Sequence, residues 1–443
     1  MVIRPPTVVA VLLGIVTVAV WPSAATVAWW LLAVAVLVGL DLLLAPATST
    51  VLVEREATGD ASRAEDGAVM LSVRLGEQAT TSLLVSNASR RRVRGVLRDA
   101  WMPSAGAGAN RHPLRLPSGE RRRLQTSLRP TRRGDRRTDR VTVRVYGPLG
   151  LAARQRSREV PGSVRALPPF DSRKHLPSRL ARLRQLDGRS AVRTRGQGTE
   201  FDSLRDYVEG DDVRSIDWRA TARRQTVVVR TWQPERDRRV IIVLDTSRTS
   251  AARVGDQPRL DAAMDAALLL ATLASRAGDR LDLIAGDRRV RGRARPDPSS
   301  PTLLSSLVSM LAPLDPVLVE ADWSMLAGVV NATSRRRALV VLLTALDPPA
   351  LEEGLLPVLG SLTAHHQVVV ASVADPALPR MAADMSSLSA VYGAAAAERT
   401  MSLRSRTAAA MERLGVHVLD EEPERLPAAL ADHYLAAKAR GLL

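Results

Sequence analysis

Residues 240–250 read VIIVLDTSRTS, and this stretch indicates what kind of domain occupies the second half of the 443-residue chain. The run at 240–244 is apolar and rich in β-branched residues, which is typical of a strand buried on both faces of a sheet. It ends at Asp245, and Ser247 and Thr249 follow. In an extended segment alternate residues point the same way, so this strand end presents one carboxylate and two hydroxyls together.

Strand-like and helical segments alternate around this stretch. Further apolar strands are predicted at 280–286, 337–345, 367–373 and 415–420, and helices at 259–277, 301–311, 323–332, 351–364 and 426–439. This alternation predicts an α/β domain with a doubly wound parallel sheet over residues 240–443. Ligands of such sheets gather at the carboxyl ends of central strands, where Thr344 also lies.

The spacing of Asp245, Ser247 and Thr249 resembles the metal-ion-dependent adhesion site of von Willebrand factor A domains, whose first motif is Asp-x-Ser-x-Ser. The resemblance implies that fold and a bound Mg²⁺ or Mn²⁺, with Thr344 and Asp347 as further candidate ligands. Hard oxygen donors suit these ions, and water would fill the remaining positions.

The later ligand loops depart from that family's pattern. Its Gly-x-Thr is not found near residues 320–324, and Ala345 stands where an acid follows Thr344. Asp322 or Asp347 would have to substitute, although the spacing differs. The alternative is that Asp245 and Ser247 satisfy backbone donors of the following loop.

Residues 200–224 read EFDSLRDYVEGDDVRSIDWRATARR, in which carboxylates alternate with arginines around a few aromatic residues. Such a segment can dock on a neighbouring sheet through its aromatics, with bidentate arginine–carboxylate pairs fixing its register. Carboxylates so close to arginine stay ionised, which favours an interaction surface over acid–base catalysis. The candidate signature and interaction residues are Glu200, Phe201, Arg205, Tyr207, Gly210, Asp211, Asp212, Arg214, Asp217, Trp218 and Arg223.

Together with Gly196 and Gly198, these residues resemble the signature of the bacterial domain of unknown function 58 family, which has a von Willebrand factor A-like fold. The likeness extends to the paired apolar N-terminal segments, to Arg-Arg-Gly near residue 133 and to GPLGL at 147–151. It implies a role with a MoxR-type AAA+ ATPase in chaperone-like work or complex assembly. The chain has no phosphate-cradling Gly-x-x-x-x-Gly-Lys-Ser/Thr loop, so ATP hydrolysis would belong to the partner.

Two apolar runs, at 7–21 and 24–45, predict a membrane anchor of two transmembrane helices within residues 1–46. The second run reaches the length of about 20 residues that a span needs, whereas the first is short. The alternative for the first run is a signal peptide cleaved near Ser23. Both interpretations place the soluble domains in the cytoplasm, at the inner (plasma) membrane, and Arg4 agrees with the positive-inside bias.

Residues 49–165 show short alternating strands between turn signals, which predicts a small antiparallel β-sandwich. This segment carries 24 arginines against 11 acidic residues, much of the excess behind the net charge of +17. The positive charge of this segment suits binding to an anionic surface. The low aromatic content of the whole chain, 3%, and the lack of a recognition motif argue against specific nucleic-acid binding. Residues 166–239 form a linker and the signature segment.

The chain has no cysteine, and its six histidines show no ligand spacing, which argues against thiol and zinc enzymes. We therefore predict a membrane-anchored protein-interaction module that is not an enzyme. Two alternatives remain open: a hydrolase that uses the acidic cluster at 200–217, and a binder of nucleic acid or anionic surfaces through the basic β-domain. The client and the oligomeric state are not indicated by the sequence.

Overall fold

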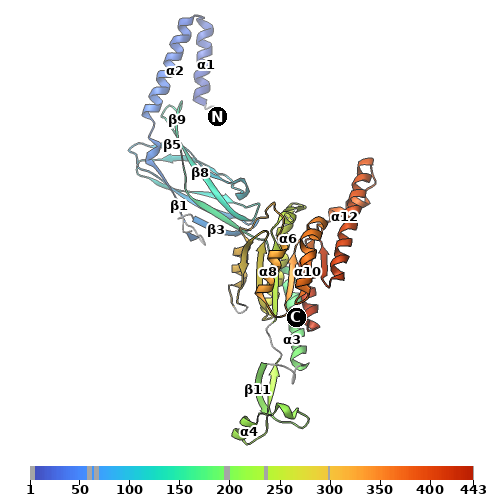
Figure 1. The fold of residues 1–443 in the computed structure, drawn as a ribbon. Helices are drawn as coiled ribbons and strands as arrows, with labels where there is room; N and C mark the ends of the chain where they lie inside the picture. Colours follow the sequence, from blue (N-terminus) through green and yellow to red (C-terminus); the bar gives the residue numbers. More distant parts are fainter. Residues whose placement is uncertain are drawn as a thin grey trace. The chain divides into compact units, whose positions relative to one another are not determined.

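The computed structural model describes residues 5–56, 62–63, 69–193, 200–233, 238–297 and 300–442. The chain divides into two compact units, Met1–Leu167 and Pro168–Leu443, called here the N-terminal and C-terminal units (Figure 1). The boundary falls close to the predicted end of the β-domain at residue 165.

Two apolar helices open the N-terminal unit, α1 (Pro5–Val20) and α2 (Ala24–Leu44). Ser23 caps α2, since its hydroxyl accepts a hydrogen bond from the backbone N–H of Thr26. Among the described residues, one helical stretch, Ala24–Thr50, is long and apolar enough to cross a membrane. At 16 residues α1 is shorter than a bilayer requires, so one candidate span stands where the sequence predicts two.

The rest of this unit consists mainly of strands. A three-stranded sheet has the order β1-β4-β7, and a second sheet has the order β2-β3-β10-β8-β5-β6, with β9 paired to β8. The predicted sandwich was purely antiparallel, whereas β3 and β10 pair in parallel. The elements are η1 (Thr48–Thr50), β1 (Val51–Glu56), β2 (Ser62–Arg63), β3 (Val69–Arg74), β4 (Ala79–Asn87), β5 (Val93–Trp101), η2 (Pro103–Ala105), β6 (Arg111–Leu116), β7 (Arg121–Leu128), β8 (Gly134–Tyr146), β9 (Ala153–Arg158) and β10 (Gly162–Leu167).

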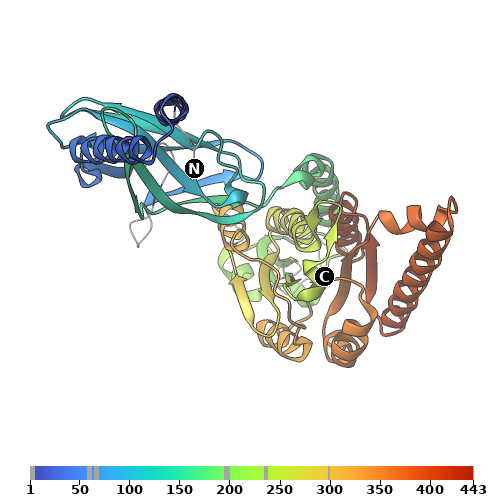
Figure 2. The same ribbon diagram turned by 90° about the horizontal axis from the view of Figure 1, so that it is seen from above.

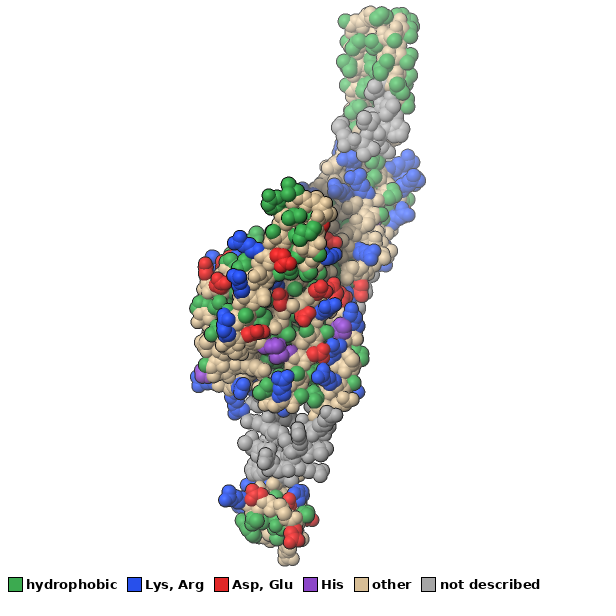
Figure 3. Space-filling view, turned by 90° about the vertical axis from the view of Figure 1, so that its right-hand side faces the viewer, with side chains coloured by type: hydrophobic (Ala, Val, Ile, Leu, Met, Phe, Trp, Pro, Cys, Tyr) green, Lys and Arg blue, Asp and Glu red, His purple; other side chains and the backbone are tan. Residues whose placement is uncertain are grey.

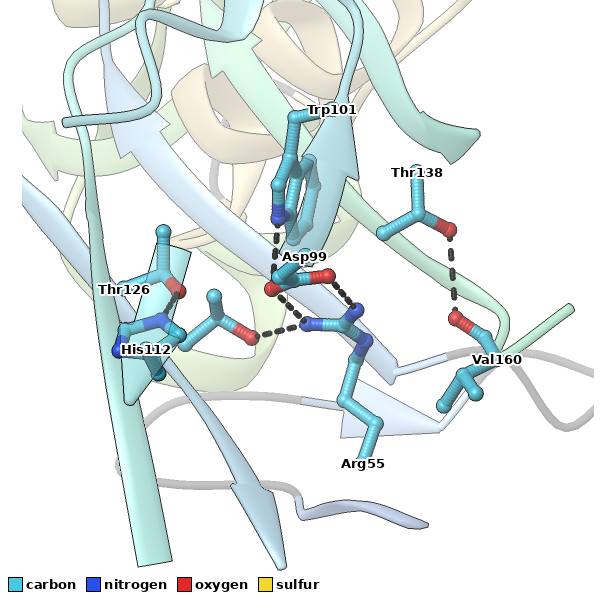
Figure 4. A network of polar contacts seen from close by, with 8 residues as sticks. Arg55, Asp99, Trp101, His112, Thr126, Thr138 and Val160 are labelled. Atoms are coloured by element: carbon cyan, nitrogen blue, oxygen red, sulfur yellow. Dashed lines mark hydrogen bonds and ion pairs between the residues drawn. The ribbon is translucent and has the colours of Figure 1, made fainter. Parts of the chain in front are cut away.

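A buried ion pair links the two sheets (Figure 4). Arg55 on β1 donates from Nη2 to Oδ1 of Asp99 on β5 at 2.7 Å, and from Nη1 to the hydroxyl of Thr81 at 2.8 Å. The indole N–H of Trp101 donates to the second oxygen of Asp99 at 2.9 Å. Both Asp99 oxygens and both terminal nitrogens of Arg55 have partners within the sandwich, while Arg55 Nε has none, and the pair joins β1 of one sheet to β5 of the other.

In the C-terminal unit, a six-stranded sheet has the order β17-β16-β13-β18-β19-β20. Its strands run parallel except for β17, which pairs antiparallel with β16. The bounds are β13 (Arg239–Asp245), β16 (Arg280–Gly286), β17 (Val290–Ala294), β18 (Leu339–Leu343), β19 (Gln367–Val373) and β20 (His417–Glu421).

Helices cover both faces of this sheet (Figure 2). Ile241 and Val243 pack into a core with residues of α8 and α10, whereas α6 and α13 pack on one another and against the sheet. The bounds are η3 (Asp171–His175), α3 (Leu176–Arg193), α5 (Arg248–Ala251), α6 (Arg259–Arg276), α7 (Leu303–Leu311), α8 (Trp323–Thr333), α9 (Pro348–Ala350), η5 (Leu351–Leu355), α10 (Leu356–Thr363), α11 (Ala377–Ala383), α12 (Leu388–Arg413) and α13 (Leu426–Ala439), with the short strands β14 (Arg253–Val254) and β15 (Gln257–Pro258).

Two helical segments differ from the prediction. The single helix expected at 351–364 divides into the π-helical turn η5 and α10, because Pro357 lacks the N–H that a continuous helix would use. The 26-residue α12 was not predicted. Its buried residues are two alanines (Ala394 and Ala397), Arg404, Thr407 and Met411, so they give no strong apolar periodicity in the sequence.

Candidate functional site

Asp245 gathers three hydroxyl-bearing residues at the carboxyl end of β13. Its Oδ1 accepts the backbone N–H of Ser247 at 2.8 Å, and its Oδ2 accepts the hydroxyls of Thr249 at 2.9 Å and Thr344 at 2.7 Å. The hydroxyls of Ser247 and Thr249 lie 3.2 Å apart. β13 and β18 are parallel neighbours, so Asp245 and Thr344 meet although 99 residues separate them.

The charge of Asp245 is poorly compensated. The side chain is 1% exposed, and burial raises the pKa of its carboxyl, while hydrogen bonds from Thr344, Ser247 and Thr249 oppose that rise. Every contact that the structure describes for this carboxylate comes from a neutral donor. A buried carboxylate in such a setting gains from a nearby cation.

A pocket of about 210 Å³ opens beside this cluster. Asp245, Ser247, Thr249 and Thr344 all line it, and Glu320 and Glu353 add two further carboxylates to the lining. With exposures of 1–6%, the four cluster residues can be reached by an ion or a water, but not by a large side chain. A partner protein would therefore contact the residues around the opening of this pocket.

Asp347, the fifth residue predicted to bind metal, is not part of the cluster. Its carboxylate lies 3.6 Å from Nη2 of Arg248, whose Nε contacts Oε1 of Glu320 at 2.5 Å. Asp322, the other predicted substitute, caps α8 by accepting the backbone N–H of Met325 at 2.9 Å. Arg248 and Glu320 line the pocket as a charged rim, and Asp347 contacts Arg248 from outside that lining.

The donor chemistry fits a small divalent cation. Carboxylate and hydroxyl oxygens suit Mg²⁺ or Mn²⁺, and Mg²⁺ is commonly held through one or two carboxylates with several waters. No group of three or more His, Cys, Asp or Glu side chains that could hold a metal occurs among the described residues, so an all-carboxylate site is not formed there. The cluster around Asp245 is therefore the candidate site.

The signature segment folds as a hairpin with a helical connection, called here the 200–233 lobe. β11 (Glu200–Asp206) pairs antiparallel with β12 (Val228–Gln233), and η4 (Val213–Ser215) and α4 (Trp218–Arg224) lie between them. The sequence predicted arginine–carboxylate pairs that fix the segment against a neighbouring sheet. The pairs form within the lobe instead, with Arg205 Nη2 at 2.5 Å from Asp211 and Arg230 Nε at 2.9 Å from Asp217.

The acidic residues of the lobe hold its turns. Asp212 and Asp217 cap η4 and α4 by accepting backbone N–H groups, and Gly210 takes the left-handed conformation, at φ +104, that its turn requires. A hydrogen bond from Arg205 lowers the pKa of Asp211, and backbone and Arg230 hydrogen bonds lower that of Asp217. Carboxyls held in this way are poor proton donors, which supports a structural role.

The remaining signature residues differ in how far their side chains are exposed to solvent. Trp218, predicted as an anchor, is 66% exposed, Tyr207 is half-buried, and Arg214 and Arg223 are exposed. The prediction that Trp218 docks the segment onto a sheet is therefore wrong. The side chains of Glu200 and Phe201, together with Gly196 and Gly198, lie outside the described part of the structure.

A family model described as "Protein of unknown function DUF58" matches residues 203–384, from the lobe to the start of the segment after α11. The match assigns residues 203–384 to the DUF58 family. Similar curated relatives are uncharacterized proteins of Mycobacterium tuberculosis and Mycobacterium bovis, each 30% identical over 184 residues. The match covers 41% of this chain and 56% of those relatives, so it spans little more than half of their length.

Among solved structures, the chain shows a likeness to a conserved hypothetical protein, BatB, from Bacteroides thetaiotaomicron, with 13% identity and a TM-score of 0.26 over 46% of this chain and 99% of that one. A PapD-like domain of human CEP192 matches with 12% identity and a TM-score of 0.20, over 27% of this chain and 87% of that one. TM-scores this low do not establish a shared fold.

The GPLGL stretch at 147–151 contacts the end of α2. The loop donates the backbone N–H groups of Leu149, at 2.7 Å, and Ala152, at 2.8 Å, to the two carboxylate oxygens of Asp41. A Cβ at Gly147 would come within 2.2 Å of Asp41 Oδ1, so glycine is required for this close approach. The sequence contains one sign of this contact: Asp41 is an acidic residue in the last turn of an apolar helix, where the helix dipole disfavours a negative charge.

Proposed function

We propose that this protein is a membrane-anchored interaction module that binds a partner protein beside a divalent cation held at Asp245. The observation that carries the proposal is the buried carboxylate of Asp245, surrounded by the hydroxyls of Ser247, Thr249 and Thr344 on the lining of a pocket. These four residues would hold Mg²⁺ or Mn²⁺. When bound, the ion would supply open coordination positions to water or to an oxygen of the partner.

The strand order of the sheet supports a von Willebrand factor A-like fold for the C-terminal unit. β13, the first strand of the sheet along the chain, lies in the middle between β16 and β18. The order of strands reverses direction at that point, which is where open α/β sheets bind ligands. Asp245 and Thr344 come from these central strands, so the candidate site lies where the fold favours recognition.

The apolar helices support a membrane anchor. α2 exposes large apolar side chains along its length, including Leu31 at 64%, Val36 at 61% and Leu43 at 75%. Such a surface is unfavourable in water and suits lipid. In this proposal α1 and α2 form the anchor, and the soluble domains face the cytoplasm at the inner membrane, in keeping with Arg4 at the N-terminus.

The partner that the family resemblance suggests is a MoxR-type AAA+ ATPase, which would supply ATP hydrolysis for a chaperone-like or assembly role. Two surfaces support protein contact. The charged rim of Arg248 and Glu320 lines the pocket, and the 200–233 lobe exposes Trp218 together with Val213 at 62%. Exposed tryptophan and arginine are enriched at the centres of protein interfaces.

A capture experiment tests the proposal. Full-length protein in detergent is immobilised and offered a purified MoxR-type ATPase of the same bacterium, with Mg²⁺ or with a chelator. We expect capture with Mg²⁺, loss of capture with the chelator or with Asp245→Asn, and retention with the matched control Asp347→Asn, whose carboxylate lies outside the cluster. Capture that neither the chelator nor Asp245→Asn reduces would contradict the cation-dependent site.

A further inference from the structure

A second pocket, of about 400 Å³, lies where α2 ends and the β-domain begins. Leu44 and Pro46 line it from the helix side, and Arg91, Arg92 and Arg94 line it from the β-domain. Tyr146 on β8 and the following Gly147 and Pro148 complete the lining. The pocket therefore combines an apolar edge that continues from α2 with three guanidinium groups.

The structure fixes these arginines relative to the helix. Arg91 Nη1 donates to the carbonyl of Leu44 at 2.9 Å, and Arg154 Nη2 donates to that of Leu42 at 2.9 Å. These carbonyls belong to the last turn of α2, which has no following helical N–H groups to bind. With the two backbone hydrogen bonds to Asp41, they attach the pocket to the end of the helix.

Arg92 and Arg94 leave their positive charge available. Both are exposed, and neither makes an ion pair with an acidic side chain in the part of the chain that the structure describes. The carboxylate of Asp41 nearby is already occupied by the backbone N–H groups of Leu149 and Ala152. Figure 3 shows Lys and Arg side chains gathered on the β-domain near the apolar helices.

The length of α2 places this pocket at a membrane surface. Its 21 residues span about 31 Å at 1.5 Å each, which equals the hydrocarbon thickness of about 30 Å. If α2 crosses the bilayer, Leu44 lies at the boundary between acyl chains and headgroups. Arginine binds phosphate oxygens in a bidentate manner, and anionic lipids attract basic residues at this depth.

We propose that the pocket of Arg91, Arg92, Arg94 and Tyr146 binds the phosphate of an anionic phospholipid headgroup. The apolar edge formed by Leu44 and Pro46 lies against the first carbons of the lipid, and the arginines hold its phosphate. This proposal rests on the membrane anchor proposed above and adds to it a specific lipid site.

The test measures lipid binding by the full-length protein in a neutral detergent. Short-chain phosphatidylglycerol, short-chain phosphatidylcholine and inorganic phosphate are titrated separately, and Kd is read from microscale thermophoresis. We expect phosphatidylglycerol to bind and phosphatidylcholine to bind at least ten times more weakly. With two arginines lost, Arg92→Gln/Arg94→Gln should weaken phosphatidylglycerol binding about 10- to 30-fold. Arg91 stays unchanged because it also holds the helix.

The matched control is Arg98→Gln/Arg111→Gln. These two exposed arginines are register partners on β5 and β6, on the same outer face as Arg94 but about 13 Å further from α2. The control removes the same charge and should leave Kd within twofold. Equal losses in both variants would show a diffuse charge effect and overturn the site, as would inorganic phosphate binding as tightly as phosphatidylglycerol.

Failure of the anchor can be separated from failure of the lipid site. Membranes that contain the full-length protein are washed with alkaline carbonate, which releases proteins that do not span. Release would refute the proposed anchor, and with it the lipid site. A protein that stays in the membrane but binds phosphatidylglycerol equally well after Arg92→Gln/Arg94→Gln would refute the lipid site alone.

Discussion

The contact between Asp41 and the GPLGL loop should be a main link between the β-domain and α2, and Asp41→Asn should loosen it. Asp41 is fully buried, and its two oxygens accept the backbone N–H groups of Leu149 and Ala152. Asparagine has the same shape but one acceptor oxygen instead of two. Its NH₂ group would face a backbone N–H, so one hydrogen bond is lost and the other loses its charge.

The expected cost follows from these two bonds. A hydrogen bond to a charged acceptor contributes roughly 1.5–3 kcal/mol, and an unsatisfied buried donor costs a similar amount. The substitution should therefore lower the free energy of opening this contact by about 2–4 kcal/mol. For a local opening reaction this corresponds to about 30- to 700-fold faster amide exchange.

Hydrogen exchange read by mass spectrometry on the full-length protein in detergent measures this effect. Peptides that contain residues 147–152 should exchange faster in Asp41→Asn, while peptides from the six-stranded sheet should not change. Asp139→Asn is the matched control, because that side chain is 56% exposed and its pair with Arg140 lies on the surface. Unchanged exchange at residues 147–152 in Asp41→Asn would refute the role assigned to this carboxylate.

Three further predictions concern the C-terminal unit. Burial, together with the neighbouring charges of His417 and Arg440, lowers the pKa of His433 from 6.5 to about 4, so the folded protein keeps this ring neutral. The contribution of His433 to stability should therefore be complete above pH 6.5 and decrease as the pH falls towards 4. In a series of Tm measurements against pH, His433→Gln should reduce this decrease, and an unchanged dependence of Tm on pH would contradict the prediction. Arg404→Leu should lower the free energy of unfolding in urea by about 3 kcal/mol, because buried Arg404 donates a hydrogen bond to Asp420 at 2.5 Å. The control Arg406→Leu, at an exposed position, should change it by no more than about 0.5 kcal/mol, and equal effects of the two variants would contradict a stabilising role of the Arg404–Asp420 pair. Trp218→Ala should leave Tm unchanged and weaken capture of the ATPase, and a large fall in Tm would show that this exposed side chain packs.

Much of the C-terminal sheet could be predicted because its strands are strongly apolar. The run at 240–244, the segments at 280–286 and 367–373, and the helix at 426–439 match β13, β16, β19 and α13 closely. α12 was not predicted because its buried face mixes alanine with polar residues, and β17 was not predicted because its five residues, VRGRA, include two arginines and a glycine. The parallel β3–β10 pair depends on contacts between distant segments, which local patterns do not report.

The candidate site shows the same limits. Ser247 and Thr249 could be placed beside Asp245 because alternation along one segment is a local property, and Thr344 because neighbouring parallel strands end together. The position of Asp347 depends on the competing charge of Arg248, which the spacing of ligands cannot reveal. The exposure of Trp218 depends equally on packing that the order of charged residues does not determine.

The proposed function depends most on Asp245 being a cation ligand, and calorimetric titration of Mg²⁺ and Mn²⁺ into the full-length protein tests this directly. We expect one binding site in the wild-type protein that weakens as the pH falls, because burial raises the pKa of Asp245 and protons compete with the ion. Asp245→Asn should abolish binding, and Asp347→Asn should keep it within a fewfold. Equal affinity of the Asp245→Asn variant and the wild-type protein would contradict the account.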